Sequence, residues 1–267
     1  MNPTDPPAIR LETLGPIARL TLDRPRRHNA LRAVDVDALH GALAEVEADP
    51  AARVVVLTGT GERTFCAGAA LDEMESGAMS GRVFDGLTDR LERFPLPTIA
   101  ALNGAVYGGG AELALCCDFR VGTPELRLSV PAARLGVCYP VGGLGRYVRR
   151  VGQGAAARIL LAAEELDAEE LLRIGYLTHL VVPAELHTEV DRLAERVASL
   201  APLAVRAMKR IMGAIADGGL AADAVTAEAS SARQEAERLV DEVAASDDTR
   251  EGLRAALERR DPEFRGR

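Results

Sequence analysis

The sequence of 267 residues contains no tryptophan, and aromatic side chains make up only 3% of it. Single-stranded nucleic acid is usually held on stacking platforms built from such rings. The formal net charge is −8 at pH 7, whereas a nucleic-acid-binding protein normally presents a basic face. We therefore expect no nucleic-acid partner.

Long apolar runs and paired cysteines are also missing. The most apolar stretch, residues 98–117, contains Asn103, Glu112 and several glycines, whereas a membrane span needs about 20 mostly apolar residues. The opening MNPTDPPAIR has no apolar segment of the signal-peptide kind. The four cysteines show neither CxxC nor metal-ligand spacing, so we expect buried free thiols in a reducing cytoplasm. We expect no membrane contact.

Several motifs of common enzyme chemistry are absent. The chain has no GxxxxGKS/T, GxGxxG, GxSxG or HExxH, so ATP-driven, NAD-dependent, serine-hydrolase and zinc chemistry all lack residue support. The four histidines share no metal-ligand spacing. We expect neither a metal site nor a separate cofactor.

The residues that are present indicate an α/β fold followed by a helical region. Hydrophobic residues make up 48% of the chain and charged residues 27%, which is typical of a globular protein with a large core. The first half alternates strands, glycine-rich loops and helices, which suggests stacked ββα-like units. Its expected elements are a hairpin at 9–14 and 17–22, helices at 34–47, 81–93 and 110–116, and strands at 53–57, 98–102, 119–121 and 126–129.

The second half is expected to be largely helical. Its predicted helices cover residues 143–150, 154–163, 168–174, 220–244 and 249–259, and two more carry apolar stripes at 186–200 and 208–215. Ser246 begins the cap of the last helix. We divide the chain into a core at 1–200 and a C-terminal helical region at 201–267. Such a region packs either on its own core or on a neighbouring subunit.

Two glycine-rich segments, residues 64–74 and 103–113, each follow a predicted strand and lead into a helix. Residues with small or no side chains let a ligand approach the backbone closely. The N–H groups at a helix start are unpaired and carry partial positive charge. Two such groups that converge can hold an oxygen that gains negative charge during a reaction, which is an oxyanion hole. The alternative is that these glycines only permit close packing of a helix on a sheet.

Glu112 belongs to the first turn of the helix that follows the second glycine segment. Its neighbours Ala111, Leu113, Ala114 and Leu115 are apolar, so we expect partial burial to make the carboxylate more basic. A base beside an oxyanion hole suits proton transfer next to a thioester carbonyl. The alternative is a helix-start charge without a catalytic role.

At these residues the sequence resembles the enoyl-CoA hydratase/isomerase family, also called the crotonase superfamily. The resemblance runs nearly from end to end. It is carried in order by LDRPRRHNAL (22–31), FCAGAALDEM (65–74), PTIAALNGAVYGGGAELALCCDFRV (97–121), APLAVRAMKR (201–210) and SDDTREGLRAALERRDPEF (246–264).

The resemblance implies a spiral of ββα units with a helical trimerisation region, assembled as a homotrimer or a dimer of trimers. It implies a coenzyme A thioester substrate, with coenzyme A as part of the substrate. It places the oxyanion-hole amides on Ala69 and Gly109 and the acid–base carboxylate on Glu112. Further substrate contacts are implied at Arg24, Ala67, Gly68, Ala70, Leu71, Gly108, Ala132 and Lys209, the last being the only lysine of the chain.

One departure from the family pattern affects the expected reaction. Hydratases carry a second catalytic glutamate directly after a proline, and here Ala132 follows Pro131. Hydration needs one group for water and one for the α proton. The next residues resemble the decarboxylase branch of the family, where a tyrosine matches Tyr139, whose hydroxyl can donate a proton or orient a carboxylate.

Several functions therefore remain open. Isomerisation or atypical hydration of an enoyl-CoA comes first, followed by decarboxylation of a malonyl-type thioester; dehydration of a hydroxyacyl thioester is a further candidate. A non-catalytic acyl-CoA-binding protein and an assembly partner are the alternatives outside enzymes. Acyl specificity is expected to come from residues 82–96 and 137–141.

Overall fold

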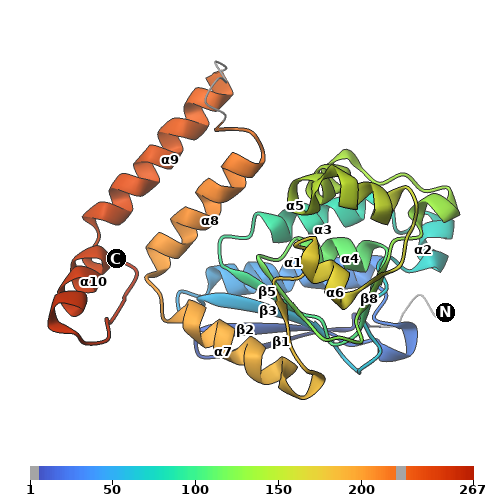
Figure 1. Ribbon diagram of the computed structural model, residues 1–267, viewed down its shortest axis with the longest axis horizontal. Helices are drawn as coiled ribbons and strands as arrows, with labels where there is room; N and C mark the ends of the chain where they lie inside the picture. The colour runs from blue at the N-terminus through green and yellow to red at the C-terminus, as the bar shows by residue number, and fades with distance from the viewer. Residues whose placement is uncertain (1–5, 221–226) are drawn as a thin grey trace.

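The structure, a computed structural model, describes residues 6–220 and 227–267 (Figure 1). Its larger sheet has the strand order β1-β2-β3-β5-β7-β10. The predicted hairpin is confirmed, because β1 (Ile9–Leu14) pairs antiparallel with β2 (Ile17–Leu22). All later pairings in this sheet are parallel. Its other strands are β3 (Val54–Gly59), β5 (Thr98–Ala101), β7 (Phe119–Gly122) and β10 (His179–Leu180).

A second sheet, not predicted from the sequence as a separate layer, has the order β4-β6-β8-β9. Its strands are β4 (Thr64–Cys66), β6 (Ala105–Tyr107), β8 (Arg127–Ser129) and β9 (Leu166–Asp167). Each repeating unit gives one strand to the larger sheet, the next to the smaller sheet, and then a helix. The series β3–β4, β5–β6 and β7–β8 therefore confirms the expected spiral of ββα units.

Helices cover both faces of the larger sheet, which explains why its central strands are apolar throughout. In β3, Val55 and Leu57 belong to the main core, together with residues of α1 (Ala33–Ala48) and α3 (Gly81–Glu92). Val54 and Val56 instead pack against α7 (Leu186–Ala198) on the opposite face. This alternation follows from the two-residue period of a strand.

The remaining helices of the core lie around the smaller sheet. They are α2 (Leu71–Ser76), α4 (Gly109–Leu115), α5 (Val141–Leu160) and α6 (Ala168–Arg173). Short 3-10 turns stand at Pro25–Arg27, Ala132–Leu135 and Pro183–Glu185. The two helices predicted at 143–150 and 154–163 form the single element α5, which bends at Gly152, where φ is +79° and ψ is 158°. These angles are not helical, and glycine permits them, so Gly152 separates two helical stretches as the sequence predicts.

The C-terminal helices form an arm that extends away from the sheets (Figure 1). It consists of α8 (Pro202–Ala216), α9 (Ala227–Ala245) and α10 (Asp247–Glu258). Part of the helix predicted at 220–244 lies outside the described residues. The predicted cap of the last helix is confirmed, since Ser246 Oγ accepts a hydrogen bond from the Thr249 amide at 3.1 Å.

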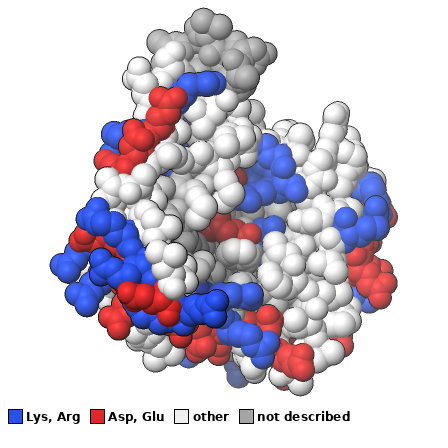
Figure 2. Space-filling model, turned by 60° about the vertical axis from the view of Figure 1, so that its left-hand side comes forward, with Lys and Arg blue, Asp and Glu red and all other residues white. Residues whose placement is uncertain are grey.

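Several large apolar side chains of the arm are exposed. Charged side chains gather over the lower part of the face shown in Figure 2. The exposed apolar residues include Met208, Met212, Ile215, Val240, Leu253 and Leu257. Among the described helices, none is long and apolar enough to cross a bilayer.

The four cysteines are free, as expected. Cys66, Cys116 and Cys117 are buried, and burial raises the pKa of the Cys66 and Cys117 thiols to about 12. Cys138 is exposed, so the expectation that all four would be buried is wrong for this residue, which lies in the surface loop before α5.

Candidate active site

The smaller sheet brings the two glycine-rich segments together. Strands β4 and β6 are parallel neighbours, with Thr64 opposite Ala105 and Cys66 opposite Val106. The loops that follow the two strands therefore leave the same edge of the sheet. One loop leads into α2 and the other into α4.

The contact between these loops needs glycine at specific positions. A Cβ atom at Gly68, where φ is +83°, would lie 2.5 Å from the Gly109 nitrogen. A Cβ atom at Gly110 would lie 2.1 Å from the carbonyl oxygen of Cys66. The start of α4 thus packs directly against the end of β4, at a distance that side chains would prevent.

The backbone around Ala69 leaves its amide available. Ala69 forms an isolated bridge with Leu31, in which Leu31 donates to Gly68 and Ala70 donates to Leu31, both at 2.8 Å. Within residues 6–220 and 227–267, neither the Ala69 amide nor the Gly109 amide donates to a protein acceptor. For Gly109 this follows from its place as the first residue of α4, where N–H groups have no partner within the helix.

A cavity of about 1110 Å³ opens at these loops. Ala69 and Gly109 both line it, together with Glu112 from α4. Residues from both segments expected to set acyl specificity, 82–96 and 137–141, also line it, namely Phe84, Asp85, Val137, Cys138, Tyr139 and Pro140.

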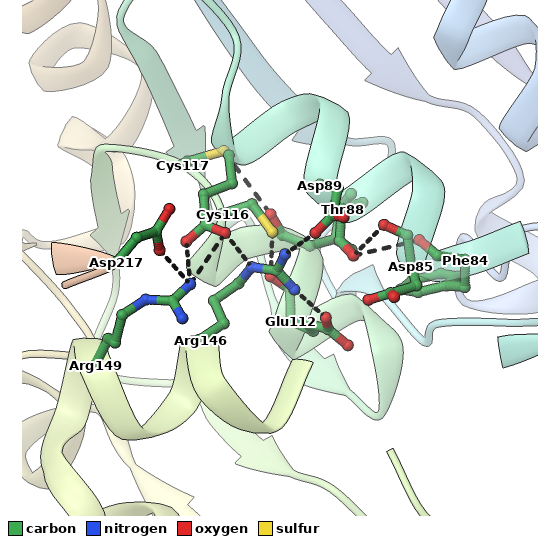
Figure 3. Close-up of polar contacts among 12 residues, drawn as sticks. Phe84, Asp85, Thr88, Asp89, Glu112, Cys116, Cys117, Arg146, Arg149 and Asp217 are labelled. Atoms are coloured by element: carbon green, nitrogen blue, oxygen red, sulfur yellow. Dashed lines mark hydrogen bonds and ion pairs between the residues drawn. The ribbon is translucent and has the colours of Figure 1, made fainter. Parts of the chain in front are cut away.

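Glu112 is 2% exposed and is held by Arg146, a fully buried arginine of α5. The Arg146 guanidinium donates to Glu112 Oε1, to Asp89 Oδ1 at 2.9 Å and to Glu92 Oε2 at 3.0 Å (Figure 3). One buried cation is thus shared by three carboxylates, of which Glu112 is the most buried.

Burial raises the pKa of the Glu112 carboxyl from the usual 4.5 to about 7, against the opposing effect of Arg146. Desolvation disfavours the charged form of a carboxylic acid. A cation shared with Asp89 and Glu92 offsets only part of that cost. The expectation that Glu112 is desolvated and more basic is therefore confirmed, and a group with this pKa can both accept and donate a proton near neutral pH.

Two neighbours fix the space around the Glu112 carboxylate. A Cβ atom at Gly143 would lie 2.9 Å from Glu112 Oε1 and 3.0 Å from Tyr139 Cδ1. Tyr139 packs edge-on against Tyr147 with the ring centroids 6.1 Å apart. Burial and the nearby Glu112 charge raise the pKa of the Tyr139 hydroxyl, so this hydroxyl stays neutral and can donate a hydrogen bond.

Ten of the twelve site residues predicted from the sequence line the cavity. They are Arg24, Ala67, Ala69, Ala70, Leu71, Gly108, Gly109, Glu112, Ala132 and Tyr139. Gly68 is buried beneath the loops and shapes them instead of lining the cavity. Arg24 is partly engaged already, because its guanidinium lies 3.1 Å from Asp35 Oδ1.

Lys209 lies away from the cavity lining. Its ammonium donates to the carbonyl oxygen of Leu96 at 2.8 Å and to Asp118 Oδ2 at 2.6 Å. These contacts connect α8 to the ends of β5 and β7. The structure does not bring Lys209 to the other site residues of this chain, and its contact with coenzyme A stays a prediction.

Sequence reasoning missed Arg146 and Asp85. Arginine is abundant in this chain, so the sequence does not distinguish Arg146 from the other arginines. Its complete burial distinguishes it in the structure. Asp85, Asp89 and Glu92 lie along one side of α3, and their spacing of four and three residues could have indicated a shared face. No sequence signal showed that this face points to Glu112.

Comparisons with known proteins agree with this fold. The sequence model of the family described as enoyl-CoA hydratase/isomerase matches residues 12–267. The chain is 36% identical over 261 residues to a crotonyl-CoA hydratase of Syntrophomonas wolfei, covering 96% of this chain and 97% of the relative. It is 37% identical over 207 residues to a short-chain-enoyl-CoA hydratase of Clostridium acetobutylicum, covering 76% and 79%.

Among solved structures, an enoyl-CoA hydratase from Bacillus anthracis superposes with a TM-score of 0.86 at 29% identity, covering 97% of this chain and 100% of that one. The chain belongs to the enoyl-CoA hydratase/isomerase family, the crotonase superfamily, and has its α/β fold with a helical C-terminal region.

Proposed function

We propose that this protein catalyses proton transfer at the α carbon of an enoyl-CoA thioester, with the thioester enolate held by the amides of Ala69 and Gly109. The observation that carries the proposal is the position of Glu112. A buried carboxyl with a pKa of about 7 lines the same cavity as two backbone amides that have no protein acceptor in the described part of the chain.

The amides would act on the charge that develops during the reaction. When the α proton leaves, negative charge moves to the thioester oxygen. N–H groups already aimed at that oxygen stabilise the transition state, and one such donor is worth about 3 kcal/mol. Gly68 and Gly110 support this role, because side chains there would separate the two loops.

Glu112 would exchange the proton with the substrate. In isomerisation, its ionised carboxylate takes a proton from Cα and the shifted double bond gains one at Cγ. Only one base is required for the first step, so the absence of a carboxylate at Ala132 does not prevent it. Arg146 keeps the carboxylate in place while burial keeps it basic.

The coenzyme A end of the substrate would lie toward the basic turn that follows β2. Arg26 and Arg27 are exposed, line the cavity and form no ion pair with the described residues. Coenzyme A carries negatively charged phosphates, and guanidinium groups are suited to bind them. Together with Arg24 these side chains form the most basic part of the cavity lining.

Decarboxylation of a malonyl-type thioester is the second candidate, favoured by the place of Tyr139. Its neutral hydroxyl group belongs to a side chain that lines the cavity beside Glu112. It could orient the departing carboxylate while the same amides hold the enolate. An ionised Glu112 in the cavity would repel that carboxylate, which makes this the less favoured function.

The arm is proposed to join copies of the chain into a homotrimer or a dimer of trimers. Its exposed apolar side chains, including Met212 and Leu257, are the support for this assembly. The boundary near residue 200 and the cytoplasmic location are proposed on the sequence alone.

The proposed function is tested by assaying purified protein with a 3-enoyl-CoA, with crotonyl-CoA and with methylmalonyl-CoA, alongside Glu112→Gln. We expect isomerisation or hydration by the native protein, a loss of about 10²–10⁴-fold in kcat for the variant, and unchanged affinity for the thioester by calorimetry. Release of carbon dioxide from methylmalonyl-CoA would instead support the decarboxylase. Binding without turnover of any of the three would identify a non-catalytic acyl-CoA-binding protein.

A further inference from the structure

Helix α3 presents three carboxylates along one face. Asp85, Asp89 and Glu92 are separated by four and three residues, which places them on the same side of a helix. Asp89 and Glu92 both accept hydrogen bonds from Arg146, at 2.9 and 3.0 Å. These two acids thereby help to hold the cation that holds Glu112.

Asp85 is the member of this row that forms no ion pair with the described residues. It lines the cavity together with Glu112, whereas Asp89 and Glu92 do not. Its Oδ1 atom is buried and accepts no hydrogen bond from residues 6–220 or 227–267. Buried polar atoms without a partner are uncommon in folded proteins. Because the Asp85 side chain lines the cavity, its carboxylate lies beside the space that a substrate or a water molecule would occupy.

Two consecutive glycines at the start of α5 bring Asp85 and Glu112 close to each other. A Cβ atom at Gly142 would lie 2.9 Å from Asp85 Oδ1, and one at Gly143 would lie 2.9 Å from Glu112 Oε1. Consecutive Cα atoms are about 3.8 Å apart, so both carboxylates reach the same turn of α5. Figure 3 shows the two side chains ending in the same region of the site.

Electrostatics also connect the two acids. The charge of Asp85 contributes to the raised pKa of Glu112. The pKa of Asp85 itself is raised by burial and by Asp89, with Arg146 acting in the opposite direction. Two interacting carboxylates in different surroundings are the arrangement by which one site supplies both an acid and a base.

We propose that Asp85 is the second acid–base group of this site and that, with it, the protein adds water to the double bond of a 2-enoyl-CoA. This inference rests on the proposed function, because it uses the same enolate site and the same Glu112. Asp85 would take over the second acid–base role, which the methyl group of Ala132 in the same cavity cannot perform.

Each proton and electron pair in the step has a destination. The Asp85 carboxylate takes a proton from water, and the water oxygen forms a bond to Cβ. The π electrons of the double bond move toward the thioester, whose oxygen becomes the enolate oxygen at the Ala69 and Gly109 amides. Protonated Glu112 then gives its proton to Cα, and exchange with solvent returns both carboxyl groups to their starting states.

The test compares two reactions in Asp85→Asn. Hydration of crotonyl-CoA is followed by the loss of enoyl-thioester absorbance, and exchange of the α protons of butyryl-CoA in deuterium oxide is followed by NMR. Exchange needs only Glu112 and the amides, whereas hydration needs both acids. We expect hydration to fall about 100-fold or more, with exchange within about threefold of the native rate. Asp85→Glu should hydrate crotonyl-CoA at least tenfold faster than Asp85→Asn.

The matched control is Glu75→Gln, which removes an exposed carboxylate of α2 that does not line the cavity; both reactions should remain at the native rate. Hydration by Asp85→Asn near the native rate, or an equal loss of both reactions, would contradict the inference. A native protein that exchanges α protons but does not hydrate crotonyl-CoA would overturn this inference alone. A native protein that does neither would overturn the proposed function as well.

Discussion

Arg146 donates to Glu112 inside the protein, where the arginine side chain has no exposed surface and the glutamate is 2% exposed. The same guanidinium serves Asp89 and Glu92, so its charge is divided among three carboxylates. Glu112 is therefore held in place by a cation and still carries a raised pKa. An ion pair with an undivided cation would also hold the carboxylate, but it would lower the pKa further. Glu112 is instead both fixed in position and basic.

The first prediction concerns the pH dependence of α-proton exchange in butyryl-CoA. Exchange requires ionised Glu112, and burial raises the pKa of this carboxyl to about 7, while Arg146 lowers it and Asp85 raises it further. The rate should therefore be low at pH 5, rise through about pH 7 and level off above pH 8. A pH–rate profile measured from 5 to 9 checks this, and a rate that is flat across the range would mean that another base acts.

A second prediction uses the close contact at Gly143. In Gly143→Ala the new methyl group would lie 2.9 Å from Glu112 Oε1, so the carboxylate must move. Small displacements of a catalytic group can cost about 100-fold in rate, and we expect kcat to fall by at least tenfold while the protein remains folded.

The matched control for this substitution is Gly154→Ala in the same helix. A Cβ atom there meets nothing within 4 Å, so activity should be native and the free energy of unfolding should rise by up to about 1 kcal/mol. Equal activity of the two variants in steady-state assays would show that the Glu112 position is not critical.

Removing the buried cation should destabilise the protein strongly. Arg146→Gln leaves Glu112, Asp89 and Glu92 without their shared partner, and breaking a buried ion pair in this way costs about 3–5 kcal/mol. Arg149→Gln is the comparison, because Arg149 is 28% exposed and lies 3.4 Å from Glu92; partly exposed pairs contribute about 1 kcal/mol or less. Urea unfolding of the two variants measures the difference, and equal losses would contradict the burial argument.

Lys209 provides a test between a structural and a substrate-binding role. Because its ammonium is bonded to Asp118 and Leu96, we expect Lys209→Ala to lower the melting temperature and leave KM unchanged. Arg210→Ala, which removes a 65% exposed side chain of the same helix, should change neither. A clear rise in KM for Lys209→Ala at unchanged stability would instead support the coenzyme A contact inferred from the sequence.

Much of the fold could be predicted because local patterns determine it. The apolar positions 36, 39, 43 and 46 indicated α1, and the β-branched run at 53–57 indicated β3. The smaller sheet was harder to predict, since strands such as β4 and β9 have only two or three residues. Their formation depends on pairing with distant segments, which no local pattern records.

The candidate site was predictable to the extent that it is built from local sequence. The glycines around Ala69 and Gly109, and the glutamate that follows them, carry a recognisable order along the chain. Arg146 and Asp85 could not be identified, because their roles depend on how α3 and α5 pack against α4. Lys209 was predicted as a site residue partly because it is the only lysine of the chain, but its side chain does not line the cavity.

A crystal structure of the native protein with bound butyryl-CoA would show whether two backbone amides hold the enolate oxygen in front of Glu112. We expect the thioester oxygen to lie about 2.7–3.2 Å from the nitrogens of both Ala69 and Gly109, with Cα facing the Glu112 carboxylate. A thioester oxygen that contacts neither amide, or a Cα turned away from Glu112, would contradict this expectation.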